Sequence, residues 1–268
     1  MDIPLGCPFG HTTCWDTADK FICRLNGIWK RDNRLVREWF SVRSNDLDYQ
    51  LFTPWGIRAA EDHYILQTYF YAFSKIFFGD ALNVQNCLLR VFLKDGKHER
   101  QWYDVRCVKK TLGRSQPFTP SNGVKFAVID IYQSTDLPNL NATLRQYLGT
   151  LLHEMTHAYL SLFVLQLTSE FQHGEGTAGH GSGWMRITYC IEKFCSQVLG
   201  LPVDLNRTFS LEREIMASGI ALRDVPFCQL DVDTAAVKKY VEERRALMRP
   251  NPIVAQDVGP SLKRQRQN

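Results

Sequence analysis

The stretch Leu151-Leu152-His153-Glu154-Met155-Thr156-His157-Ala158-Tyr159 contains the pattern H-E-x-x-H inside an apolar run. On a helix, two histidines four residues apart lie on one face, about one turn from each other. Their imidazole nitrogens can therefore bind one Zn²⁺ together, at about 2.0–2.1 Å. Glu154 directly follows the first histidine, so its carboxylate would lie beside the metal and could accept a proton from an activated water. The pattern predicts a zinc site with Glu154 as the catalytic base.

The flanks of this motif predict a mostly buried helix over about residues 142–168. Buried histidines need polar partners, whereas histidines on an exposed helix face would simply be hydrated. Apolar side chains recur at helical spacing on both sides of the motif, which favours the buried helix and therefore metal binding. These side chains are Leu148, Leu151, Leu152, Met155, Tyr159 and Leu162.

A catalytic zinc site usually has three protein ligands and one open position. The compact pattern H-E-x-x-H-x-x-G-x-x-H is excluded, because Leu160 and Phe163 stand where it requires glycine and histidine. We favour His180 as the third ligand, since glycines flank it on both sides and let the backbone approach a metal closely. The other candidates in this glycine-rich segment are, in decreasing order, His173 and then Glu170 or Glu175.

The apolar pattern predicts an α+β fold with a small antiparallel sheet packed against helices, including the motif helix. Two strands, Leu88–Lys94 and Glu99–Lys109, flank Asp95-Gly96, which is a favoured hairpin turn. A third strand is predicted at Lys125–Gln133, and the proline-containing residues before it are predicted to form a loop. The other predicted helices cover residues 18–42, 61–78, 182–199, 211–222 and 234–248.

Composition predicts a soluble, intracellular protein. The 268 residues are 44% hydrophobic and 22% charged, which is enough for a sizeable core. Eight cysteines without a C-x-x-C pair favour reduced thiols over a disulfide framework. The sequence begins without a basic and apolar leader, and its longest apolar stretch is too short to span a bilayer, so neither secretion nor a membrane is expected.

Positive charge is concentrated at the C-terminus. The formal net charge is +4, and residues 238–268 carry eight Lys/Arg against three Asp/Glu. Such a segment could assist nucleic-acid binding, or it could simply be a solvated tail.

In combination, the motifs resemble the SprT-like (Spartan-type) family of zinc metalloproteases. That family has H-E-M-x-H-A and then a third histidine in G-H-G-x-x-[FW], and residues 153–158 and 179–184 match both patterns in that order. The resemblance spans about residues 60–200. It implies a zincin-like fold, with His153, His157 and His180 as Zn²⁺ ligands and Glu154 as the catalytic base.

The resemblance also implies a substrate, a partner and a location. The family is implicated in the DNA-stimulated cleavage of proteins crosslinked to DNA, so it implies a protein substrate, single-stranded or chromatin-associated DNA as a partner, and the nucleus as location. Two other interpretations remain open. One is a zinc protease with no dependence on nucleic acid, and the other is a non-catalytic DNA- or protein-binding module braced by zinc.

The chain is expected to divide into four segments. Residues 1–59 form an N-terminal helical extension, 60–200 the SprT-like metalloprotease domain, 201–249 a C-terminal helical extension, and 250–268 a disordered basic tail.

Overall fold

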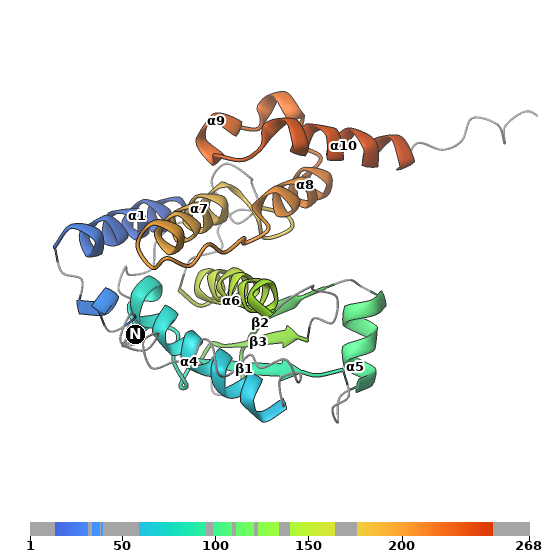
Figure 1. Ribbon diagram of the computed structural model, residues 1–268. Helices are drawn as coiled ribbons and strands as arrows, with labels where there is room; N and C mark the ends of the chain where they lie inside the picture. The colour runs from blue at the N-terminus through green and yellow to red at the C-terminus, as the bar shows by residue number, and fades with distance from the viewer. Residues whose placement is uncertain are drawn as a thin grey trace, which may run out of the picture.

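The protein combines a three-stranded sheet with helices that pack against it, which confirms the α+β class (Figure 1). The computed structural model describes residues 14–31, 34–37, 39, 59–94, 99–108, 111–120, 123–133, 140–163 and 176–248. Within these ranges the elements are α1 (Cys14–Arg31), α4 (Ala59–Phe78), β1 (Cys87–Phe92), α5 (Glu99–Tyr103), the π-helical turn η1 (Asp104–Val108), β2 (Gly113–Phe118), β3 (Phe126–Tyr132), α6 (Leu140–Phe163), α7 (Ser182–Gln197), α8 (Arg207–Ser218), the 3₁₀ turn η2 (Leu222–Asp224), α9 (Phe227–Leu230) and α10 (Thr234–Met248). The tail at 250–268 lies outside the described residues, and the four-segment division stays a prediction.

The sheet is mixed, with the strand order β1-β3-β2. Strand β2 is antiparallel to β3, whereas β1 is parallel to it, so the prediction of an antiparallel sheet is wrong for β1. The connection from β1 to β3 contains a helix and a further strand, and a connection of that length allows parallel pairing. The central strand turns Ala127, Ile129 and Ile131 into the core, where all three are fully buried.

The predicted strand at Glu99–Lys109 is also wrong, because residues 99–108 form α5 and η1. Trp102 and Val105 are three residues apart, which is a helical spacing, and both are buried in a small cluster with Phe92 and Tyr132. The second strand is instead β2, inside the predicted loop. Its Pro117 is compatible with a strand because β2 lies at the edge of the sheet. The expected turn at Asp95-Gly96 lies outside the described residues.

Apart from the short α5 and η1, which pack on Phe92 and Tyr132, the helices form layers over one face of the sheet (Figure 1). Helix α6 packs on β2 and β3, while α4 packs on β1 and on α6. Helix α7 covers α6, and α1 packs on α7. Helices α8, α9 and α10 continue from α7 on the side away from the sheet. The motif helix is therefore enclosed between the sheet and α7. None of the helices in the described ranges is long and apolar enough to cross a membrane.

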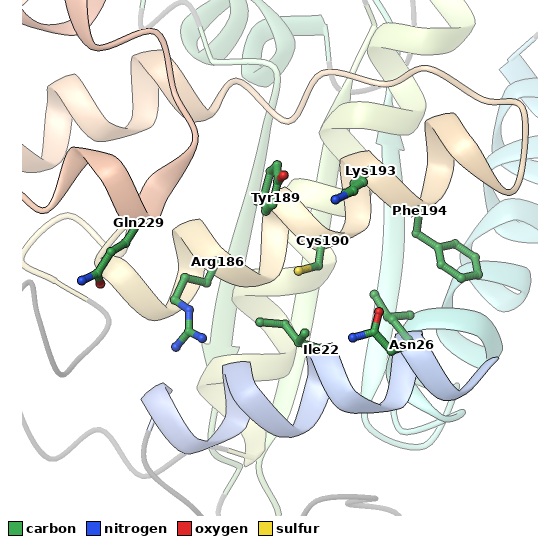
Figure 2. A pocket seen from close by; sticks show the side chains of 9 residues that line it. Ile22, Asn26, Arg186, Tyr189, Cys190, Lys193, Phe194 and Gln229 are labelled. Atoms are coloured by element: carbon green, nitrogen blue, oxygen red, sulfur yellow. The ribbon is translucent and has the colours of Figure 1, made fainter. Parts of the chain in front are cut away.

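A cavity of about 300 Å³ lies between α1 and α7, with Gln229 of α9 at its rim (Figure 2). Arg24 holds α1 against the end of α4. Its guanidinium donates hydrogen bonds to the carbonyl oxygens of Ile76 (2.9 Å) and Phe77 (2.6 Å). None of the motif histidines lines this cavity, so it is separate from the predicted zinc site.

Gly149 lets the extended segment before α8 lie directly against the motif helix. A Cβ atom at this position would come 2.3 Å from the carbonyl oxygen of Asp204, so no larger residue fits without moving the backbone. Gly149 lies one turn before His153 on α6. The close approach at Gly149 therefore brings the backbone after Asp204 to the motif histidines.

We predict that Gly149→Ala destabilises the fold by about 1–3 kcal/mol, because the added methyl group must displace main chain rather than a flexible side chain. Gly27→Ala is the matched control, since Gly27 is also helical and nothing lies within 4 Å of a Cβ placed there. That change should stabilise the protein slightly, by about 0.5–1 kcal/mol. Urea denaturation of both variants measures the difference, and equal effects at the two glycines would contradict the packing described here.

Candidate metal centre

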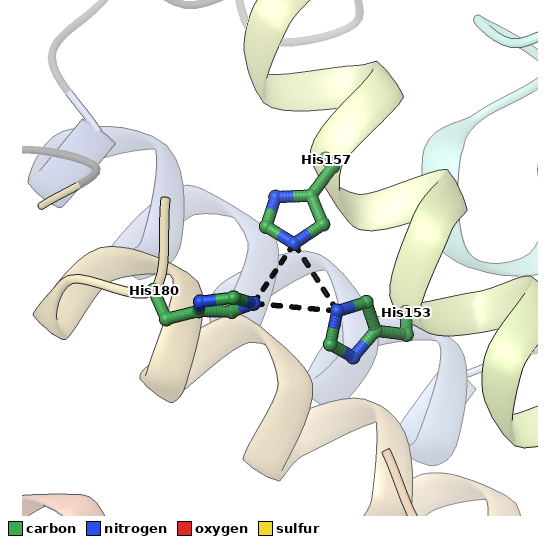
Figure 3. A group of neighbouring side chains, drawn as sticks. All are labelled: His153, His157 and His180. Atoms are coloured by element: carbon green, nitrogen blue, oxygen red, sulfur yellow. Dashed lines mark hydrogen bonds between the residues drawn. The ribbon is translucent and has the colours of Figure 1, made fainter. Parts of the chain in front are cut away.

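Three histidine rings converge on one point between α6 and the start of α7 (Figure 3). His153 and His157 come from α6, and His180 comes from the segment just before α7. The Nε2 atom of His157 lies 3.2 Å from that of His153 and 3.2 Å from that of His180, and the third side of the triangle measures 3.3 Å. The structure therefore brings together the three residues predicted as ligands, and this group could hold a metal ion.

The size of this triangle fits a tetrahedral metal ion. Ligands at about 2.0 Å from a tetrahedral centre are separated from one another by about 3.3 Å, which is the spacing of the three Nε2 atoms. Three imidazole nitrogens also form a donor set that suits zinc and other borderline transition metals. The metal-binding group found among the described residues has three members, and these three alone would leave a fourth tetrahedral position for water or substrate.

The tautomer of His153 is fixed by the backbone of Leu205. The Nδ1 atom of His153 lies 2.9 Å from the carbonyl oxygen of Leu205. A carbonyl oxygen can only accept, so Nδ1 must carry the proton and Nε2 must present a lone pair towards the other two rings. Such an outer hydrogen bond is the usual arrangement for a metal-binding histidine.

His180 reaches the other two histidines through a sharply bent segment. Gly179 has φ +81°, a left-handed conformation that favours glycine, and a Cβ atom there would lie 3.3 Å from Cε1 of His157. The backbone of this segment is bound by Glu214 of α8, which accepts hydrogen bonds from Thr177 and His180, among others. The local backbone therefore decides where the third imidazole lies.

Trp184 lies against all three histidine rings. It is fully buried, stacks on His157 at a centroid distance of 5.4 Å, and meets His153 and His180 edge-on at 4.8 and 4.7 Å. The indole closes one side of the centre and restricts the rotation of each ring.

The environment keeps the three imidazoles neutral, which is the form that binds metals. Burial lowers the pKa of His153 to about 4 and that of His180 to about 3, and it lowers the pKa of His157 well below its ordinary value. The guanidinium of Arg213 on α8 lowers the pKa of His153 and His180 further. A cationic side chain therefore lies within electrostatic range of the centre.

Glu154 is buried between α6 and the edge strand β2. Its side chain is 6% exposed, and its carboxylate accepts a hydrogen bond from the backbone N–H of Ser115. Burial raises the pKa of Glu154 to about 8; the Ser115 N–H opposes this shift and the Asp130 carboxylate adds to it. Gly113 makes the approach possible, because a Cβ atom there would come 2.9 Å from Cγ of Glu154.

The alternative ligands His173, Glu170 and Glu175 lie outside the described residues. The outer contacts from Leu205, Glu214 and Ser115 were not predicted. No residue spacing signals a backbone carbonyl, and Glu214 lies 34 residues beyond the histidine segment to which it binds. These partners become apparent only when the chain is folded.

Comparison of the chain with protein-family models, with curated proteins and with solved structures gave no match. The interpretation of this centre therefore depends on its own residues and geometry.

We predict that the protein binds one zinc ion and that His180→Ala weakens binding strongly, because two imidazoles on one helix cannot complete the site. His63→Ala is the control, since His63 is exposed on α4 and should leave binding unchanged. Metal content after dialysis and chelator competition measure both variants. Unchanged zinc affinity in His180→Ala would exclude His180 as a ligand.

Proposed function

We propose that the protein is a zinc-dependent endopeptidase of the SprT-like type, with a zincin-like catalytic domain. The observation that carries this proposal is the convergence of three Nε2 atoms, 3.2–3.3 Å apart, together with a buried glutamate, Glu154, directly after the first histidine on α6. The sequence resemblance to that family, through residues 153–158 and 179–184, supports the same conclusion.

His153, His157 and His180 would hold the metal, and their donor set favours zinc. A bound zinc ion would supply Lewis-acid chemistry, which activates water at neutral pH and polarises a carbonyl group. The three protein ligands leave a fourth position for these reactants. A purely structural zinc site would close that position with a fourth protein ligand, so the donor set favours catalysis over a zinc-braced binding module.

Glu154 would act as the proton carrier in peptide hydrolysis. Burial favours the protonated form of Glu154, but the positive charge of a bound zinc ion would favour the carboxylate. That carboxylate would accept the proton of the attacking water and then deliver it to the leaving amine. The Ser115 N–H fixes the orientation of the side chain, while Gly113 lets β2 approach it. A buried carboxylate held in this way has a defined position from which to transfer a proton.

The edge strand β2 offers a place for a peptide substrate. Among the described strands, β2 pairs only with β3, and the Ser115 N–H that binds Glu154 belongs to β2. An extended peptide added along the open edge of β2 would therefore pass beside the catalytic carboxylate.

We also propose that the substrates are proteins bound or crosslinked to DNA in the nucleus. This part rests on the family resemblance and on the excess of positive charge in residues 238–268. A zinc protease without any dependence on nucleic acid is the alternative, and the response to DNA distinguishes the two.

For the catalytic base, we predict that Glu154→Gln retains zinc but hydrolyses peptides about 10²–10⁴-fold more slowly than wild type. The amide has the same shape as the carboxylate but cannot accept the proton. Cleavage of a denatured protein substrate is measured alongside zinc content, with Glu243→Gln on the exposed face of α10 as the control. Full activity in Glu154→Gln would remove Glu154 from the mechanism.

For the partner, we predict that single-stranded DNA accelerates cleavage of a DNA-binding substrate and that the acceleration decreases as salt is raised. Proteolysis is compared with no DNA, with single-stranded DNA and with double-stranded DNA at equal nucleotide concentration. A rate that does not respond to either form of DNA would favour the nucleic-acid-independent protease.

A further inference from the structure

We propose that Glu214 on α8 is a positioning residue that holds His180 in its metal-binding place and thereby sets the metal affinity of the centre. This inference rests on the metal centre of the proposed function, but it does not depend on which peptides are cleaved.

Glu214 is a fully buried carboxylate, and among the described residues it forms no ion pair. A buried charge needs compensation, and here it comes from three backbone N–H groups. Oε1 accepts from Thr177 at 2.6 Å, and Oε2 accepts from Ala178 at 2.8 Å and from His180 at 3.2 Å. The carboxylate therefore binds the backbone of the third ligand itself and of the residues that precede it.

The segment that Glu214 binds is shaped for this contact. Gly176 has φ +81°, and a Cβ atom there would come 2.5 Å from Cδ of Glu214. Only glycine allows the main chain to approach the carboxylate so closely while the next N–H groups point at it. The same segment then turns at Gly179 and presents His180 to His157.

Glu214 acts on the third ligand through the backbone. Its carboxylate accepts a hydrogen bond from the N–H of His180 itself, so a change at Glu214 changes where the imidazole lies. Residues that orient a metal ligand typically change metal affinity by about 10- to 100-fold when they are mutated. Glu214 would act through the geometry of the segment that carries His180.

A second buried glutamate on the same helix provides a matched control. Glu212 is 3% exposed, but its carboxylate pairs with Arg244 of α10 at 2.8 Å and so faces away from the histidine segment. Glu212→Gln and Glu214→Gln both replace a buried carboxylate on α8 with an isosteric amide. Only Glu214→Gln places an NH₂ group against the N–H donors of the segment that carries His180.

The test compares wild type, Glu214→Gln and Glu212→Gln by zinc competition with a chelator and by the visible absorption of the Co²⁺-loaded proteins. We expect Glu214→Gln to weaken zinc binding by about 10- to 100-fold and to alter the Co²⁺ spectrum, with Glu212→Gln unchanged in both. Without metal, the amide hydrogens of Thr177, Ala178 and His180 should exchange faster in Glu214→Gln. Wild-type affinity in Glu214→Gln, or equal losses in the two variants, would overturn the proposal.

If Glu214→Gln does not fold, Gly176→Ala tests the same contact by changing the main chain that the carboxylate approaches. The added methyl group would displace the carboxylate without altering α8, so zinc affinity should again decrease, and an unchanged affinity would overturn the proposal. Failure of the proposed function gives a different result: wild type that binds zinc but cleaves no peptide refutes the protease and leaves the role of Glu214 supported by the binding data.

Discussion

The centre of this structure depends on the meeting of three imidazole Nε2 atoms in a space enclosed by protein. Neutral nitrogens 3.2–3.3 Å apart gain nothing from one another unless a proton or a cation lies between them. For His153 the proton is on the far side of the ring, where it binds the Leu205 carbonyl. Burial opposes a second proton on any of the three rings. A metal ion bound by all three Nε2 atoms would satisfy this arrangement.

The surroundings of the three rings show why so much of the chain is needed to build one centre. The sheet supplies the β2 backbone that binds Glu154, and α7 supplies Trp184 beneath the rings. The segment before α8 supplies the Leu205 carbonyl, and α8 itself supplies Glu214. Residues on both sides of position 200 therefore contact the centre, although residue 200 was the expected end of the catalytic domain.

The ligands were predictable from sequence because helical periodicity and glycine flanks act locally. His153 and His157 lie on one face by their spacing alone, and glycines next to His180 indicate a backbone that can bend towards them. The class of fold and the ends of α4, α7 and α10 follow from similar local signals, whereas α1 and α8 each begin four residues before the predicted start. The strand order does not, because β1 and β3 pair across the length of chain that holds α5 and β2. Strand β2 carries few apolar residues and a proline, so only its packing against α6 and β3 reveals it.

The central claim is that His153, His157 and His180 form a tetrahedral zinc site with one open position. X-ray absorption at the zinc edge of the zinc-loaded protein tests it most directly. We expect four-coordinate zinc with three imidazole nitrogens and one oxygen at about 2.0–2.1 Å. Sulfur in the coordination shell, fewer than three imidazoles, or six-coordinate zinc would contradict the arrangement of ligands described here.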